Sequence, residues 1–350
     1  MENQSSQLVG WRSPSNIALV KYLGKHGDQL PRNPSISFTL SNAFTETIVQ
    51  YEKLDYTQDK ISTHFYFEGK PNEAFQLRID SFLNKHLSSL DFLKSVQLNI
   101  ESRNSFPHSS GIASSASAMS ALVLCLLSIE EKLKGTIVDF TQKASHFARL
   151  ASGSASRSVF PLASLWGKCE LEGSSDEYAI QLENIDSVFT QFHDDILIVS
   201  ANEKAVSSSA GHQLMANNPY AETRYARARQ HVIDSYTYLN EGNIEALGEI
   251  IENEALELHA LMMSSNPSYI LMQPNTLAII SAIRKFRAES KKPIYFTLDA
   301  GPNVHVLYPN EIREEAQSFI NEQLKRFCTQ ERIINDKVGT GPEQINQFTL

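Results

Sequence analysis

One segment constrains the fold of this chain more than any other. Residues 106–118 read FPHSSGIASSASA; they follow the alternating stretch 96–102 and run into the apolar stretch 118–132. This order predicts a strand, a loop of small residues and a buried helix. Small side chains let a backbone approach a ligand closely, and a helix N-terminus favours an anion. The segment therefore suits phosphate binding, with a serine-rich helix cap as the alternative, although no lysine follows its glycine as in the GxxxxGK[ST] loop.

The remainder of the chain mixes hairpins with packed helices, which is typical of an α+β fold rather than a doubly wound parallel sheet. A length of 350 residues favours two domains, which we place at 1–195 and 196–350, and the termini can cross back. Strand and hairpin material is expected at 35–52, and further strands at 62–68, 96–102, 194–201, 293–297, 304–308 and 332–334. Helices are expected at 73–90, 118–132, 137–151, 220–265 with a charged face that includes Arg224 and a break at 240–243, 277–288 and 311–327.

Composition excludes several classes of protein. A net charge of −9 disfavours general nucleic-acid binding, which needs a concentrated basic surface, so an anionic ligand would need local cations and backbone N–H groups. No apolar run reaches 18 residues, and no secretory signal opens the chain, so we expect no membrane partner. Three widely spaced cysteines predict neither a disulfide framework nor a zinc site, and they fit a reducing cytosol.

Three charged residues lie in segments that suggest chemistry. Lys21 lies among apolar residues, where an ammonium is costly unless it is paired or functional; the alternative is a snorkelling lysine on a strand edge. Arg157 follows a run of small residues and could offer its planar fork to a carboxylate or phosphate, or could simply lie on the surface. Asp299 ends an apolar strand, which suits a carboxylate at the mouth of a cleft or an Asx-type turn. Together with the serine loop, these residues favour phosphoryl chemistry.

Taken together, these segments resemble the diphosphomevalonate decarboxylase family, part of the superfamily that includes galactokinase, homoserine kinase and mevalonate kinase. The resemblance covers nearly the whole chain, and order and spacing agree with the family. The SGIASSASA stretch is shared with the wider superfamily, whereas NIALVKYLGK, GSASR and LDAGPN are more specific. The similar stretches are NIALVKYLGK (16–25), NPSISFTLS (33–41), FPHSSGIASSASA (106–118), GSASRS (153–158), VSSSAGH (206–212), TLDAGPNVHV (297–306) and VGTGP (338–342).

The resemblance implies a fold and an activity. The fold would be a ribosomal-protein-S5-like N-terminal domain and a ferredoxin-like C-terminal domain, with the active site in the cleft between them. The activity would be decarboxylation of mevalonate 5-diphosphate to isopentenyl diphosphate in isoprenoid biosynthesis. It would use ATP and Mg²⁺ and proceed through phosphorylation of the 3-hydroxyl. The family also implies a cytoplasmic homodimer.

Site residues follow from the matching motifs. The resemblance makes Asp299 the catalytic aspartate, Arg157 the arginine that grips the substrate carboxylate, and Lys21 the lysine beside the aspartate. Substrate contacts are expected from Ala18, Tyr22, Ser152 and Ser154, and Arg78 is a candidate for the distal phosphate. Nucleotide contacts are expected from Ser109, Gly111, Ala113, Ser114, Ser115 and Ser208, and no residue is assigned to a metal.

The chain departs from the family pattern at three positions. Leu23 replaces a usual tryptophan, His108 replaces a small residue or threonine, and His212 replaces a frequent methionine. The pocket wall and nucleotide contacts are therefore open to change. Three alternatives follow: a mevalonate 3-kinase, a decarboxylase of a mono- or bisphosphate, and a non-catalytic relative that binds a nucleotide or metabolite.

Overall fold

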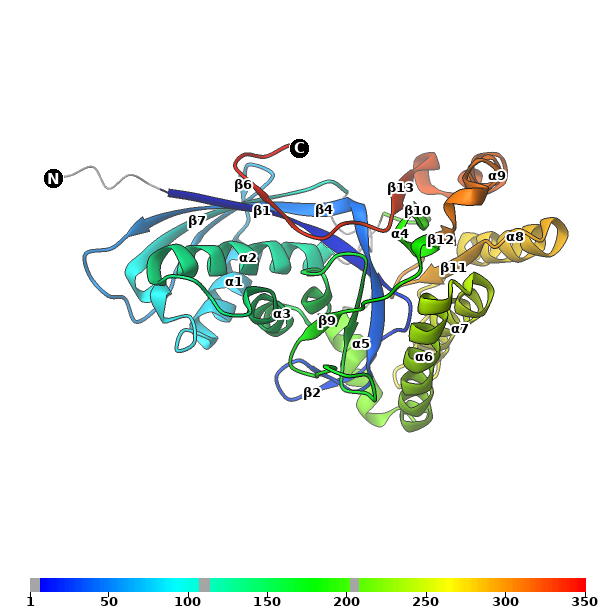
Figure 1. Cartoon of the computed structure of the whole chain (residues 1–350), viewed down its shortest axis with the longest axis horizontal. Coiled ribbons are helices and arrows are strands. Elements are labelled where there is room, and N and C mark those ends of the chain that lie inside the picture. Colours follow the sequence, from blue (N-terminus) through cyan, green and yellow to red (C-terminus); the bar gives the residue numbers. More distant parts are fainter. Residues whose placement is uncertain (1–6, 107–113, 202–207) are drawn as a thin grey trace.

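The computed structural model describes residues 7–106, 114–201 and 208–350, and the described part has two large sheets and one two-stranded sheet (Figure 1). Within these ranges the first sheet has eight strands, and its long central strands are β1 (Gln7–Ala18), β4 (Ser35–Lys53) and β7 (Val96–Asn104). Strand order is β14-β1-β4-β7-β5-β6, with β8 beside β4 and β9 beside β8. The shorter strands are β5 (His64–Phe67), β6 (Lys70–Pro71), β8 (Ala163–Trp166), β9 (Ala179–Gln181) and β14 (Glu343–Ile345), and β2 (Lys25–His26) pairs with β3 (Leu30–Pro31) apart from them.

Helix α2 (Ser114–Lys134) packs on β1 and β4 and is buried along most of its length. Its leucines, together with α1 (Glu73–Lys85) and α3 (Phe140–Ala151), form a core against the sheet. A helix that is apolar on nearly all sides must lie inside the protein, as the sequence of this segment predicts. The N-terminus of α2 is thereby fixed at one end of the sheet.

The second sheet follows the order β-α-β-β-α-β along the chain. Its strands are β10 (His193–Leu197), β11 (Tyr295–Leu298), β12 (Val304–Tyr308) and β13 (Ile333–Lys337), all antiparallel, in the order β11-β12-β10-β13. This is the ferredoxin-like arrangement. Its long helices are α6 (Ala221–Glu241), α7 (Ile244–Met263) and α8 (Pro274–Ser290), and α4 (Ser187–Thr190), α5 (Ser208–Leu214) and α9 (Arg313–Phe319) are short.

The two sheets share an apolar core. Residues of the first sheet such as Ile36 and Phe38 belong to one buried cluster with Ile196 of β10 and Val232 of α6. The C-terminal segment returns beside the first sheet, where β14 pairs with β1 (Figure 1). The N-terminal and C-terminal parts of the chain therefore share one apolar core and one sheet. The division into two domains at residue 195 stays a prediction.

Local patterns predicted many of these elements. The break at 240–243 is confirmed, because Gly242 ends α6 in a left-handed conformation and the Asn243 side chain caps α7 at Ala246 N. Strand β12 is also confirmed at 304–308. The hairpin expected within 35–52 is wrong, since this segment is one continuous strand. Strand β1 was not expected, because buried positions along it carry polar residues such as Ser13 and Asn16.

Candidate active site

A cavity of about 310 Å³ brings together residues from distant parts of the chain. Its walls come from the loop after β1, the end of α3, helices α1, α5 and α7, and the turn after β11. Nine of the residues expected at the site line it: Ala18, Lys21, Tyr22, Arg78, Ser115, Ser152, Ser154, Arg157 and Asp299. The sequence motifs thus converge on one space, although they are up to 281 positions apart (18 to 299).

Lys21 and Asp299 form an ion pair in this cavity. Lys21 Nζ lies 3.3 Å from Asp299 Oδ1, and the lysine side chain is 2% exposed while the aspartate is 26% exposed. Burial lowers the pKa of Lys21, although the charges of Asp299 and Glu254 oppose that shift. Lys21 follows the end of β1 and is not on a strand edge, so the snorkelling alternative is wrong. The partly exposed carboxylate remains accessible from the cavity.

Arg157 is buried beside this pair and keeps unused hydrogen-bonding capacity. It lies on the short helical turn Gly153–Arg157, and its guanidinium donates to the Ser35 hydroxyl. The alternative that Arg157 simply lies on the surface is wrong, since this residue is 2% exposed. Burial lowers its pKa to about 10, and the nearby Asp299 charge opposes this. Its Nε is buried and has no hydrogen-bond partner in the part of the chain that the structure describes, while the side chain as a whole lines the cavity.

Aromatic rings form one wall. Tyr22 packs edge-on against Trp166, with 4.8 Å between ring centroids, and lies 4.4 Å from the His212 ring. Burial raises the pKa of Tyr22 to about 12, so it remains a neutral phenol. Gly153 is required here, because a Cβ would lie 2.7 Å from the Tyr22 hydroxyl oxygen. Burial also lowers the pKa of His212 to about 3, which leaves a neutral ring whose Nδ1 accepts from Gly24 N.

The start of α2 reaches the same cavity. The helix begins at Ser114, and Ser115 lies 3.3 Å from Ser152, measured between their hydroxyl oxygens. A 21-residue helix directs its free N–H groups and positive dipole end here, which suits phosphate. The expected contacts Ser109, Gly111 and Ala113 lie outside the described residues, as does His108. Ser208 begins α5, and its side chain is also outside them.

Arg78 and Lys25 are two further cations that line the cavity. Arg78 comes from α1, and Lys25 from β2, where its Nζ donates to Gln29 Oε1 at 2.8 Å. Burial lowers the pKa of both groups. Cations at this position suit an anionic group of a ligand whose other end lies near Lys21 and Arg157. Leu23, a departure from the family pattern, also lines the cavity.

Several residues near the site gave no signal in the sequence. His259 Nε2 donates to the backbone carbonyl of Asp299 at 3.1 Å, and burial lowers its pKa to about 4. The prediction that Arg224 lies on an exposed charged face is wrong, because this side chain is 4% exposed. It is buried because its partner Glu254 lies on the adjoining helix α7. Nothing within a single helix predicts such a pairing.

Comparison with known families identifies both halves of the chain. Residues 13–179 match the family described as the diphosphomevalonate decarboxylase-like N-terminal domain. Residues 195–347 match the mevalonate 5-diphosphate decarboxylase C-terminal domain. The two matches follow each other along the chain in the order that the sequence motifs predict.

Individual relatives agree with this result. The diphosphomevalonate decarboxylase of Gibberella zeae is 31% identical over 85% of this chain and 79% of its own length. The phosphomevalonate decarboxylase of Haloferax volcanii is 29% identical over 82% of this chain and 84% of its own. A solved structure described as MDDEF in complex with MVAPP, AMPPCP and magnesium has a TM-score of 0.81 and 28% identity, and covers 98% of this chain and 100% of its own.

Proposed function

The chain belongs to the diphosphomevalonate decarboxylase family, and we propose that it converts mevalonate 5-diphosphate, with ATP, to isopentenyl diphosphate, ADP, phosphate and CO₂. The observation that most supports this is the Lys21–Asp299 pair beside Arg157 in one cavity. A carboxylate, an ammonium and a guanidinium are the groups that such a reaction needs around a hydroxy acid.

Asp299 takes the proton of the tertiary 3-hydroxyl as that oxygen accepts the terminal phosphoryl group of ATP. The carboxylate is partly exposed to the cavity, and Lys21 holds one of its oxygens from the other side. The lysine therefore orients the base and limits its freedom to turn away from the hydroxyl. General-base help of this kind contributes about 10²- to 10⁴-fold, and the rest of the phosphoryl transfer depends on positioning and charge neutralisation.

In the second step the C3–O3 bond breaks with its electron pair leaving on phosphate. The C1–C2 electron pair becomes the new C2–C3 double bond as CO₂ departs. Arg157, which lines the cavity, holds the carboxylate, and its planar fork fixes the plane of that group. Tyr22, which lines the cavity and packs on the buried Trp166, helps to keep water from the electron-poor carbon.

The nucleotide and its metal fit the serine end of the cavity. Ser114 and Ser115 at the start of α2 would contact the phosphates, with Ser109, Gly111, Ala113 and Ser208 as further expected contacts. Mg²⁺ supplies neutralisation of phosphate charge when bound with the nucleotide. The positive end of α2 and the Ser115–Ser152 contact support this placement.

The number of phosphate groups on the substrate needs an argument and a test of its own. Arg78 and Lys25 give the cavity two more cations, which favours a diphosphate, whereas the Haloferax volcanii relative is named for a monophosphate. The test is product identification after incubation with ATP, Mg²⁺ and, in separate reactions, mevalonate, its monophosphate and its diphosphate. Isopentenyl diphosphate and CO₂ from the diphosphate alone are expected. Phosphorylated product without CO₂ would indicate a 3-kinase, and saturable binding without turnover would indicate a non-catalytic relative.

Quaternary structure and location belong to the same proposal. We expect a cytoplasmic homodimer, and a mass near twice 39.2 kDa in analytical ultracentrifugation would support the dimer. No helix in the described part of the chain is long and apolar enough to cross a membrane. The domain division at 195 would be supported by limited proteolysis that releases fragments ending near that residue.

A further inference from the structure

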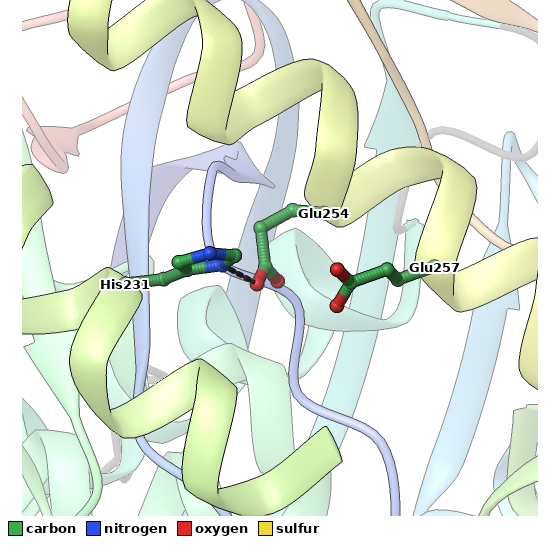
Figure 2. A group of neighbouring side chains, drawn as sticks. All are labelled: His231, Glu254 and Glu257. Carbon is green, nitrogen blue, oxygen red and sulfur yellow. Dashed lines mark hydrogen bonds and ion pairs between the residues drawn. The ribbon is translucent and has the colours of Figure 1, made fainter. Parts of the chain in front are cut away.

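Two helices beside the cavity bring together His231, Glu254 and Glu257 (Figure 2). One possible ligand atom from each lies within 4.8 Å of the others, which is a spacing that could hold a cation. Arg224 already fills this place. Its Nη1 donates to Glu254 at 2.7 Å and to Glu257 at 3.3 Å, and its Nη2 donates to the other Glu254 oxygen. The cation of the cluster is therefore a guanidinium.

Two further hydrogen bonds of this pair go to the active-site loop. Arg224 Nη2 donates to the backbone carbonyl of Lys21 at 2.9 Å, and Lys21 N donates to Glu254 Oε2 at 2.7 Å. Lys21 lies three residues beyond β1, where the sheet no longer provides backbone partners. Buried peptide groups need such partners. The ion pair from α6 and α7 thus bonds both backbone polar groups of Lys21, and Asn33 Nδ2 is a second donor to its carbonyl at 3.0 Å.

We propose that Arg224 and Glu254 are positioning residues, which hold the Lys21 backbone so that its ammonium stays against Asp299. This rests on the proposed function of the Lys21–Asp299 pair. Lys21, Arg224 and Glu254 are at most 4% exposed, so water cannot replace these bonds. Charge-assisted bonds on both sides of one residue fix its place more tightly than neutral ones would. A shift of about 1 Å at a catalytic group can cost 10²-fold in rate.

Glu254 has a further hydrogen-bond partner in His231. His231 Nδ1 lies 2.5 Å from Glu254 Oε1, and Arg227 Nε donates to His231 Nε2 at 3.4 Å, which leaves the histidine proton on Nδ1 facing Glu254. Burial alone would raise the pKa of Glu254, but Arg224 and His231 outweigh it and the pKa lies below its usual value. Glu254 therefore stays an anion.

The anion also acts on Lys21 through space. Four influences set the pKa of Lys21: burial and Arg157 lower it, whereas Asp299 and Glu254 raise it. His259, which also lies near this lysine, is a neutral ring at physiological pH. Removing the charge of Glu254 should therefore lower the pKa of Lys21 further. A purely structural ion pair elsewhere in the protein would leave that pKa unchanged.

Helix α7 offers a matched control at Glu252. This residue is also buried, and its carboxylate accepts hydrogen bonds from Arg287 Nη1 at 2.5 Å and Nη2 at 3.1 Å. Arg287 Nη1 also donates to the Ile294 carbonyl at 2.7 Å. Glu252 thus makes the same kind of ion pair, two positions away, with a backbone group far from Lys21. Glu252→Gln removes the same charge and leaves the active-site loop untouched.

The experiment compares Glu254→Gln with Glu252→Gln in the full chain. We expect Glu254→Gln to lower kcat by about 10²-fold with little change in KM, and to shift the alkaline limb of its pH profile to lower pH. Glu252→Gln should destabilise the fold similarly while its kcat and pH profile stay near wild type. Equal kinetics in the two variants would overturn the proposal. If Glu254→Gln does not fold, Arg224→Lys serves, because an ammonium cannot reach both carboxylates and the Lys21 carbonyl.

A second measurement does not depend on turnover. Competitive acetylation across a pH series, followed by mass spectrometry, reports the pKa of Lys21. A lower pKa in Glu254→Gln, with no change in Glu252→Gln, supports the proposal even if wild type fails to release CO₂. The same Lys21 pKa in all three proteins would contradict it. Failure of the proposed function would instead appear in the wild-type product assay alone.

Discussion

The cavity and the junction between the two sheets both bury charged side chains, but they use them differently. At the junction, Asp336 accepts backbone N–H bonds from Ser41, Asn42 and Ala43 at 2.7–2.8 Å. Its neighbours Asp194 and Asp195 accept from His305, and from Tyr308 and Asn335, respectively. Each of these carboxylates is held by groups of the protein itself.

In the cavity the charged side chains are placed where a ligand can meet them. Arg157 Nε has no partner within the described ranges, and Asp299 is partly exposed beside Lys21. Buried charge alone therefore does not mark a functional site, because the junction also buries charged side chains. The distinguishing feature is that Lys21, Arg157 and Asp299 line a cavity. Substitutions in the cavity should affect turnover, and those at the junction should affect stability.

The sharpest test of this comparison exchanges aspartate for asparagine at both places. Asp299→Asn removes the base and should lower kcat by about 10³-fold, with nucleotide affinity largely retained. Asp336→Asn is the matched control, since it makes the same change at the junction. Steady-state kinetics and nucleotide-analogue titration measure both. Near-normal turnover in Asp299→Asn would remove that residue from the catalytic role.

A second test uses two buried arginines. Arg157→Lys keeps a charge but loses the planar fork, so kcat should fall by about 10²-fold. Arg149 is equally buried and is held by the carbonyls of Glu177 and Asp28 and by the Glu177 carboxylate. Arg149→Lys should lower the melting temperature and leave kcat near wild type. Equal kcat values in the two variants would show that Arg157 has only a structural role.

These predictions also show what the sequence could and could not provide. Residues with local signals were found: Lys21 in an apolar run, Arg157 after small residues, and Asp299 at a strand end. That these three residues would meet at one site was predicted from the family resemblance, because no local sequence pattern determines the fold. Glu254 had no signal, because its role depends on Arg224 across a helix pair. Strand β1 was missed because Ser13 and Asn16 are buried against other polar side chains, Ser120 and Ser158.

The junction itself should show a particular dependence on pH. Burial raises the pKa of Asp336 to about 6 from an ordinary 3.8, although backbone N–H groups oppose this. Because the folded pKa is the higher one, this contribution to stability is fully present below about pH 4 and is lost as pH rises through about 6. Its size is on the order of 3 kcal/mol.

Urea unfolding from pH 4 to 7 measures this effect. The asparagine side chain introduced by Asp336→Asn does not titrate, so the difference in unfolding free energy between wild type and variant should change across this range. Turnover of the variant should remain near wild type, because the junction does not line the cavity. A constant difference in unfolding free energy would contradict the raised pKa.

The smallest expected effect concerns the serine end of the cavity. Ser115→Ala removes one hydroxyl at the start of α2 and should raise the KM for ATP about fivefold, the cost of one hydrogen bond. Ser128→Ala is the control, because Ser128 is a buried serine of the same helix whose hydroxyl accepts from Trp11 Nε1 at 2.9 Å. That hydroxyl is used inside the protein, so its loss should lower stability and leave KM unchanged. An unchanged KM in Ser115→Ala would instead place the nucleotide phosphates away from Ser115, because a donor that contacts no phosphate costs nothing when it is removed.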